Sequence, residues 1–375
     1  MKNLLFTLSL LFLAQSVFAQ RIALVRQDGK FGYIDESGNF LVKPTYLKAK
    51  DFSDGAAAVF DGEKWGYINP AGEVIVKFQY EAAKPFDSGI AIVENESGWQ
   101  YIDKAGKKLE MPASEKLYDF NDGIALIKDD MGKIGAINPQ GEIVIEPKYA
   151  AIKKFVNGHA RFKDGVLWGL IDKTGKIVVE PIYTEIGNYA PEGIIAEKGD
   201  KHGIIANGTF NEVKGAVKLW KFQPGEELTY ARKDGLMGFV NKSGEWVIKP
   251  KFEKARAFSE GLAPVSTDGK KWGYCDPTGK VVIAEQYRDA DIFSEDGLAP
   301  VKISKLWGFI NKEGKMVIAD EYIITAGFST FTGEAKGFIE GIARVRKGKK
   351  WGYIDTEGNA LNGTWYQNAE LFTEN

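Results

Sequence analysis

The stretch KWGYINPAG at residues 64–72 decides what this chain of 375 residues folds into. Nearly the same motif occurs ten times, and in nine of the copies a glycine occupies the position of Gly66. These glycines are Gly32, Gly66, Gly135, Gly169, Gly203, Gly238, Gly273, Gly308 and Gly352, and Gln100 takes the position in the third copy. Successive copies lie 34 or 35 residues apart, except for one step of 44. A constant period of this size is typical of a repeat architecture.

Within each repeat the residue pattern predicts β-strands. A short apolar run, such as IAIV at 90–93, precedes a polar turn and the aromatic strand, where Trp65 and Tyr67 share one face because side chains alternate. The segment NPAG at 69–72 suits a type I turn, since Asn caps it, Pro presets φ and Gly accepts a left-handed conformation. A β-branched run follows, so we expect each unit to be a three-stranded antiparallel meander.

The connection between units contains Pro-x-Tyr and then a phenylalanine followed by a glycine. Tyr80, Ala83 and Phe86 are three residues apart, which fits either a single helical turn or an irregular loop. Both alternatives stay open at this point. Pro264 and Pro300 lie in the first apolar run of their units, and because proline cannot donate to a ladder, that run is expected to be an edge strand.

These patterns predict an all-β repeat array of about ten three-stranded antiparallel units. An isolated hairpin is marginal in water, so each unit must bury its aromatic rings against its neighbours. An open or superhelical array is the first expectation, because closed propellers usually have four to eight larger blades. One or two propeller-like closed rings are the alternative.

The N-terminal residues 1–19 differ from the repeats. Lys2 supplies a positive start, an apolar core follows at 4–13, and Val17 and Ala19 are small residues at the end. This pattern predicts a secretory signal peptide that is cleaved before Gln20. It is too short to span a membrane, and no other stretch is long and apolar enough to do so. We therefore expect an exported chain in the periplasm, on the outer surface or outside the cell.

The remaining chain divides into two sets of repeats. Residues 20–200 hold repeats one to five, and residues 226–375 hold repeats seven to ten. The sixth repeat, at 201–225, is the most eroded and is the best candidate for a hinge. The ninth repeat carries an insertion of about nine residues near 326–336, and insertions in repeat arrays often lie on the binding face.

The motif Lys/Leu-Trp-Gly-Tyr-Ile-Asx-x-x-Gly, followed by Pro-x-Tyr, resembles the bacterial WG-repeat (KWG) family over residues 21–372. The clearest copies contain Trp65, Gly66 and Tyr67, Trp168 and Gly169, Trp272 and Gly273, Trp307 and Gly308, and Trp351 and Gly352. Gln100, Ile134, His202 and Met237 depart from the pattern. The resemblance implies an exported interaction module with structural repeat residues and no catalytic residues to assign.

Composition and motif content disfavour several functions. Basic and acidic residues nearly balance, at 49 and 51, which argues against general nucleic-acid binding. His159 and His202 occupy ordinary repeat positions, and no serine is marked as a nucleophile. Cys275 replaces an apolar strand residue, which predicts a buried thiol. We expect no catalytic residue and no cofactor.

A metal site is also disfavoured. The first turn position holds an aspartate in five repeats, at Asp35, Asp103, Asp172, Asp276 and Asp355, which a calcium ladder could use. Four other repeats have asparagine there. A turn cap accepts either residue, whereas a calcium site would lose charge, so we interpret the position as a cap. Acidic residues elsewhere are scattered, and no pair stands out for glycoside cleavage.

Aromatic residues outside the repeating column are the best candidates for ligand binding. They are Trp220, Trp246 and Trp365, together with Phe328 and Phe331 of the insertion. The sequence therefore predicts an exported, non-catalytic binding or scaffold protein that recognises a protein or cell-envelope component. A carbohydrate- or peptidoglycan-binding module is the alternative, and a hydrolase is a third candidate. Partner identity and oligomeric state stay open.

Overall fold

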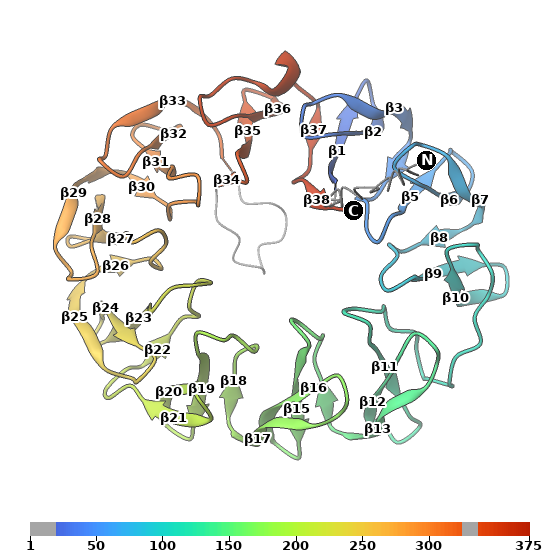
Figure 1. Cartoon of the computed structure of the whole chain (residues 1–375), viewed down its shortest axis with the longest axis horizontal. Coiled ribbons are helices and arrows are strands. Elements are labelled where there is room, and N and C mark those ends of the chain that lie inside the picture. The colour runs from blue at the N-terminus through green and yellow to red at the C-terminus, as the bar shows by residue number, and fades with distance from the viewer. Residues whose placement is uncertain (1–19, 325–336) are drawn as a thin grey trace, which may run out of the picture.

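The computed structural model of this chain describes residues 20–324 and 337–375. Its described elements are β-strands, apart from one 3₁₀ turn, η1 (Leu361–Gly363). The strands form ten small antiparallel sheets that follow one another around a central opening (Figure 1). The fold is therefore a ten-bladed β-propeller, and the predicted all-β class is confirmed.

The second blade shows the plan of the others. From the central opening outward it consists of β4 (Lys48–Ala49), β5 (Ala57–Phe60), β6 (Trp65–Ile68) and β7 (Val74–Tyr80). The last three strands are the predicted meander. The innermost strand, only two residues long, was not predicted.

The first five blades contain the following further strands. Blade one has β1 (Arg21–Gln27), β2 (Lys30–Ile34) and β3 (Phe40–Tyr46). Blade three has β8 (Ala82–Ala83), β9 (Ile90–Asn95) and β10 (Gly98–Asp103), and blade four has β11 (Ala125–Lys128), β12 (Ile134–Ile137) and β13 (Ile143–Tyr149). Blade five has β14 (Ala151–Ile152), β15 (His159–Asp164), β16 (Leu167–Asp172) and β17 (Ile177–Tyr183).

The remaining blades follow the same order. Blade six has β18 (Glu185–Ile186), β19 (Ile194–Lys198), β20 (Lys201–Ala206) and β21 (Thr209–Glu212), and blade seven has β22 (Lys218–Leu219), β23 (Leu228–Lys233), β24 (Leu236–Asn241) and β25 (Trp246–Phe252). Blade eight has β26 (Lys254–Ala255), β27 (Ala263–Ser266), β28 (Trp272–Cys275) and β29 (Val281–Tyr287), and blade nine has β30 (Asp289–Ala290), β31 (Ala299–Lys302), β32 (Trp307–Ile310) and β33 (Met316–Tyr322). Blade ten has β34 (Phe338–Ile339), β35 (Ile342–Lys347) and β36 (Lys350–Ile354). The last two strands are β37 (Asn368–Ala369) and β38 (Thr373–Glu374).

The connection after Pro-x-Tyr is neither a helical turn nor an irregular loop. It forms the innermost strand and then a tight turn, in which Asp54 and Gly55 have φ values of 52° and 76° and Ser53 bridges Ala56. Two successive positive φ angles are typical of a type I′ hairpin turn. The expected edge strand is corrected as well: β27, which contains Pro264, lies between β26 and β28.

The glycine of the motif is required by close contact between strands. The register between β6 and β7 shifts at Gly66, between the pairs formed by Trp65 and by Tyr67. A Cβ atom on Gly66 would lie 2.8 Å from the carbonyl oxygen of Val76. Only glycine allows the bulged outer strand to approach this closely.

The ring is closed by strands from both ends of the chain. β1 pairs with β37 through Val25 and Ala369, and with β38 through Ile22 and Thr373. The C-terminal segment thus supplies the inner strand of blade one. This arrangement confirms the closed-ring alternative in its single-ring form, while the open or superhelical array that was expected first does not form. Closure leaves no terminal blade with a bare face.

The hydrophobic core lies between the blades. Tyr67 of blade two meets Phe86 of blade three edge-on, with ring centroids 4.6 Å apart, and its hydroxyl donates to the carbonyl of Lys84 at 2.7 Å. Equivalent aromatic pairs join other blades, at Tyr33–Phe52, Tyr101–Phe120, Phe239–Phe258, Tyr274–Phe293, Phe309–Phe338 and Tyr353–Phe372. Each blade therefore buries its aromatic strand against the blade that follows.

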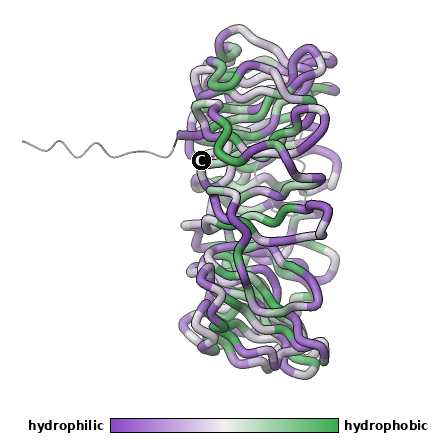
Figure 2. Tube along the Cα trace, turned by 90° about the vertical axis from the view of Figure 1, so that its right-hand side faces the viewer, coloured by the Kyte–Doolittle hydropathy of each residue, from purple (hydrophilic) through white to green (hydrophobic). Residues whose placement is uncertain are grey.

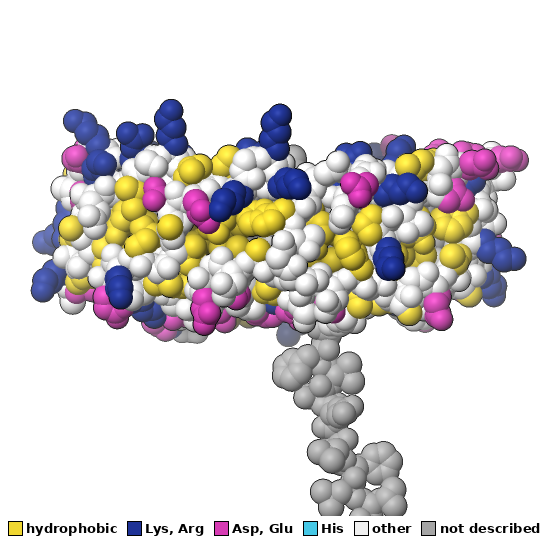
Figure 3. Space-filling model, turned by 90° about the horizontal axis from the view of Figure 1, so that it is seen from above, with side chains coloured by type: hydrophobic (Ala, Val, Ile, Leu, Met, Phe, Trp, Pro, Cys, Tyr) yellow, Lys and Arg dark blue, Asp and Glu magenta, His cyan; other side chains and the backbone are white. Residues whose placement is uncertain are grey.

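The body has two faces, which Figure 2 shows edge-on as the two sides of a flat ring. Face A carries the turns between the second and third strands, such as residues 61–64, and the segments that join one blade to the next. Face B carries the Asx turns, such as 69–72, and the inner type I′ turns, such as 53–56. In Figure 3, lysine and arginine side chains stand along much of one rim, whereas aspartate and glutamate are frequent along the opposite rim.

Candidate functional site

Six of the ten aromatic strands have a tryptophan at their start, which lies toward face A beside a basic side chain of the same blade. In blade two the ammonium group of Lys50 lies 5.8 Å from the ring centroid of Trp65, and in blade three Lys84 lies 5.9 Å from Trp99. The same pairing occurs at Lys153–Trp168, Arg256–Trp272, Lys302–Trp307 and Arg344–Trp351. Contacts of this kind are attractive because the ring face is electronegative.

The tryptophans at the start of the aromatic strands, called the column tryptophans, differ in how much of the side chain is exposed to solvent. Trp272 and Trp307 are buried, and Trp65, Trp168 and Trp351 are half-buried. The glycines next to them, Gly66, Gly169, Gly273, Gly308 and Gly352, are buried as well. Trp99 is 47% exposed, so its ring is available to a ligand.

A cavity of about 470 Å³ lies next to Trp99 on face A. Lys84, Trp99, Glu115 and Lys116 are among its lining residues, and it lies between blades three and four. In the neighbouring blade two, burial lowers the pKa of Lys50, and the nearby charge of Lys84 lowers this pKa further. Neighbouring blades thus place like charges close enough to interact on this face.

Trp220, one of the predicted binding residues, takes the place of the cation in blade seven. Its backbone N–H donates to Tyr230 O as that of Lys50 does to Ala58 O in blade two, and Met237 occupies the column position. The indole stacks on Tyr230 with ring centroids 4.7 Å apart. In this blade a tryptophan therefore stands in the position of the basic residue and a methionine in the position of the tryptophan, a difference that the repeat alignment could have revealed. A cavity of about 260 Å³ beside Trp220 also contains Trp272 and Arg256.

The other predicted binding residues lie apart from Trp220. Trp246 packs on Gly238 of its own blade, and its indole N–H donates to the carbonyl of Lys214 at 3.2 Å. Trp365 packs on Gly352 and stacks with Tyr322 at 6.4 Å. All three tryptophans are half-buried. They do not line one groove, and their role in ligand binding stays a prediction.

Phe328 and Phe331 lie outside the described residues, so the predicted binding role of the insertion stays a prediction. The sixth repeat, at 201–225, contains β20 and β21 of the four-stranded blade six and β22 of blade seven, and the hinge expected there stays a prediction. The signal peptide predicted at 1–19 also lies outside the described residues, and it stays a prediction. Within the described chain, no helix is long and apolar enough to cross a membrane.

The residues considered for catalysis or metal binding pack against neighbouring side chains, lie buried or cap turns. His159 stacks on Tyr189 with ring centroids 3.9 Å apart, and His202 Nδ1 lies 3.2 Å from a Glu197 oxygen. Burial raises the pKa of the Cys275 thiol to about 12. Asp276 caps its turn by accepting hydrogen bonds from the N–H groups of Thr278 and Lys280. Over residues 20–324 and 337–375, no group of three or more His, Cys, Asp or Glu is placed to hold a metal.

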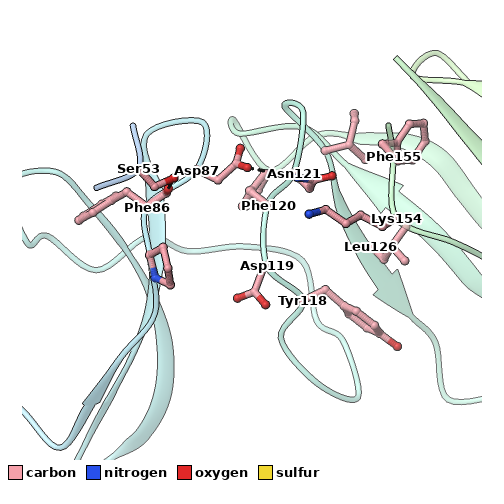
Figure 4. A pocket seen from close by; sticks show the side chains of 12 residues that line it. Ser53, Phe86, Asp87, Tyr118, Asp119, Phe120, Asn121, Leu126, Lys154 and Phe155 are labelled. Atoms are coloured by element: carbon pink, nitrogen blue, oxygen red, sulfur yellow. Dashed lines mark hydrogen bonds between the residues drawn. The ribbon is translucent and has the colours of Figure 1, made fainter. Parts of the chain in front are cut away.

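A further cavity, of about 530 Å³, opens between blades three and five, where the segment preceding β11 forms no inner strand (Figure 4). Asp87, Asn121 and Lys154 are among the residues that point toward it, and Phe86 and Phe120 also line it. The third repeat, which precedes this segment, has Met-Pro-Ala at 111–113 in place of Pro-x-Tyr. An inner strand, β22, does form in the sixth repeat, which lacks Pro-x-Tyr as well, so this loss alone could not have predicted the cavity.

The fold and the repeated aromatic contacts define a propeller built from WG motifs. The chain belongs to the family of proteins with WG containing repeats, whose sequence pattern matches residues 31–65, 65–99, 134–165, 168–197, 237–270, 272–307, 307–322 and 333–351. The predicted family is therefore confirmed. No curated protein matches the chain in sequence.

Solved structures resemble the chain in fold. One described as a eukaryotic initiation factor is 8% identical, with 94% of this chain and 98% of that chain covered and a TM-score of 0.50. BamB from Moraxella catarrhalis is 14% identical, with coverages of 67% and 90% and a TM-score of 0.34. PorZ from Porphyromonas gingivalis is 10% identical, with coverages of 91% and 58% and a TM-score of 0.25. At these identities the first similarity supports the propeller fold alone.

Proposed function

We propose that this protein is an exported, non-catalytic scaffold that binds a protein or cell-envelope component through face A. The observation that supports this proposal best is the repeated contact between a basic side chain and a tryptophan, which occurs in six described blades. The tryptophan is buried in blades eight and nine and partly exposed in the other four. Tryptophan and arginine are enriched where protein partners bind most strongly. A partner with repeated acidic and apolar groups can engage several blades at once and gain avidity.

The proposed export depends on residues 1–19. If they are a signal peptide, the mature chain isolated from the periplasm, the outer surface or the medium begins at Gln20. N-terminal sequencing of the protein from each fraction tests this. Recovery from the cytoplasm alone, with Met1 still present, would contradict export.

The binding proposal is tested by comparing three forms of residues 20–375. The first is wild type, and the second carries Lys50→Gln, Lys84→Gln and Lys153→Gln on face A. The third is a matched control with Lys107→Gln, Lys176→Gln and Lys315→Gln, which removes the same charge from exposed positions on face B. We expect an envelope component to bind wild type and the control but not the face A variant. Equal capture by all three forms would refute the role of face A.

Carbohydrate binding is the second candidate, and the exposed ring of Trp99 favours it. A flat aromatic side chain can stack on a sugar ring, and Lys84, Glu115 and Lys116 beside it can bind sugar hydroxyl groups. Binding of soluble peptidoglycan fragments by wild type, lost in Trp99→Ala and retained in Trp168→Ala, would support this alternative over a protein partner.

A further inference from the structure

The sixth blade lacks the type I′ inner turn that blades two, three, four, five, eight and ten share. Pro191 and Glu192 stand where blades two and five have Asp54–Gly55 and Asn157–Gly158, whose φ values are all positive. Proline fixes φ near −65°, so a type I′ turn cannot form there. The loop at 187–193 consequently takes another path.

This loop also changes how an aromatic residue is buried. Tyr189 occupies the position that Phe52 and Phe86 have in their blades, where both phenylalanines are buried. The Tyr189 ring instead stacks on His159 and stays half-exposed. A cavity of about 570 Å³ opens on face B between blades five and seven. That volume is within the range of small-ligand sites, about 300–1,000 Å³.

Arg161 lines this cavity from β15. The same strand position in blade ten holds Arg344, and the two arginines make equivalent bonds: Arg161 Nη1 donates to Ile186 O at 3.3 Å, and Arg344 Nη1 donates to Ala369 O at 3.0 Å. In the other described blades this position holds an uncharged residue, such as Ala58 or Tyr230. A cation here is therefore particular to these two blades.

The two arginines differ in their acidic partner. Arg344 Nη1 lies 3.4 Å from a carboxylate oxygen of Glu370, the residue that follows Ala369. The residue that follows Ile186 is Gly187, so blade six provides no carboxylate at this point. The Nε of Arg161 is buried and has no hydrogen-bond partner among the described residues. An arginine fork that lacks its carboxylate thus faces an open cavity.

The other lining residues suit a ligand with an apolar part. Ile195, Leu219 and Phe222 provide apolar surface, and the charged residues besides Arg161 are Glu192 and Lys221. Glu192 already accepts a hydrogen bond from the N–H of Gly225 at 2.9 Å. We propose that this cavity binds a ligand that carries a carboxylate on an apolar body. The Arg161 guanidinium binds the carboxylate of the ligand, as Arg344 pairs with the carboxylate of Glu370 within the protein.

This site lies on face B and is independent of the binding proposed for face A. The carboxylate can come from a small acid or from the free C-terminus of a peptide. The probes are therefore N-acetyl-leucine and the peptide N-acetyl-Gly-Gly-Ala-Ala-Leu, each compared with its C-terminal amide by isothermal titration calorimetry on residues 20–375. We expect at least one acid to bind about tenfold or more tightly than its amide. Binding of the peptide alone would assign a peptide ligand, and binding of both would assign a small carboxylate as sufficient.

Two variants test the role of Arg161. Arg161→Gln should weaken binding of the acid by about tenfold or more and leave the amide unchanged. Gly187→Glu should place an internal carboxylate where Glu370 lies in blade ten, and so block the site. A Cβ at position 187 would lie 3.3 Å from Ile195 O, which requires only a small shift. The urea midpoints of both variants are measured to distinguish a blocked site from an unfolded protein. The midpoint of Gly187→Glu should be no lower than that of wild type.

Arg232→Gln, in a different cavity, is the matched control and should bind like wild type. The proposal is overturned if neither acid binds, if the amides bind as well as the acids, or if Arg161→Gln binds like wild type. It is also overturned if folded Gly187→Glu retains full affinity.

Discussion

Asp51 gives the sharpest test of how the closed ring is stabilised. It precedes Phe52 in the connection between β4 and β5, near the segment that closes the ring. Burial and, to a smaller extent, the Glu370 carboxylate raise the pKa of its carboxyl from 3.8 to about 6, and a hydrogen bond from its own backbone and the Arg344 cation offset only part of this shift. Its Oδ1 atom is buried without a hydrogen-bond partner among the described residues. Ionised Asp51 therefore opposes folding.

The direction of the pH effect follows from the two pKa values. In the unfolded chain the carboxyl loses its proton near pH 3.8, whereas in the folded ring it keeps the proton until about pH 6. The folded state thus binds more protons between these values, and stability falls as pH rises through this window. A shift of about two units corresponds to about 3 kcal/mol, and partial contact with solvent reduces the expected cost to about 1–3 kcal/mol above pH 6.

Asp51→Asn removes this charge with almost no change in shape. We expect the variant to match wild type near pH 4 and to be about 1–3 kcal/mol more stable at pH 8, as measured by urea unfolding across that range. Asp61→Asn is a control of opposite sign. Asp61 is exposed and accepts hydrogen bonds from the N–H groups of Glu63 and Lys64, which lower its pKa, so its replacement should destabilise at pH 8. A difference between Asp51→Asn and wild type that is the same at pH 4 and pH 8, or of the opposite sign at pH 8, would refute the reasoning.

Three further outcomes are expected from the fold, each measured by urea or thermal unfolding. Trp272→Ala should destabilise the protein by about 3–5 kcal/mol because the ring is buried. Trp99→Ala, at an exposed ring, should change stability by under about 0.5 kcal/mol. Equal effects of the two substitutions would contradict the assigned burial. Tyr67→Phe should cost about 1 kcal/mol, because the carbonyl of Lys84 loses its donor; an unchanged midpoint would show that this bond between blades contributes nothing. Deletion of residues 367–375 should abolish cooperative unfolding of blade one and raise its amide exchange, and wild-type exchange in β1 would show that closure is dispensable.

Most of each blade could be predicted because its signals are local. The Asx-Pro-x-Gly turn at 69–72, the alternation at Trp65–Ile68 and the β-branched run after the turn each act over a few residues, and the structure contains the hairpin that they predict. The inner strand was missed because two residues such as Lys48–Ala49 are too short to show a period.

Closure could not be predicted from the repeat because it depends on pairing between residues more than three hundred positions apart. Ile22 and Thr373 carry no local pattern that selects each other. The cavity beside Arg161 was also missed, although its signals are in the sequence. Pro191 at a position where six other blades have positive φ, and Arg161 at a position where only Arg344 is also charged among the described blades, become visible once the repeats are aligned strand by strand.

The seam at β1 has a consequence for how the molecule is made. A polypeptide that emerges amino end first exposes the edge of β1 from the start, yet the strands that cover this edge, β37 and β38, are synthesised last. Throughout translation and any passage across a membrane, the growing chain is therefore an incomplete arc. The unpaired edge of β1 can then pair with a strand of a neighbouring nascent chain. The edge of β1 is therefore the place where pairing with another chain competes with closure of the ring until β37 and β38 are made.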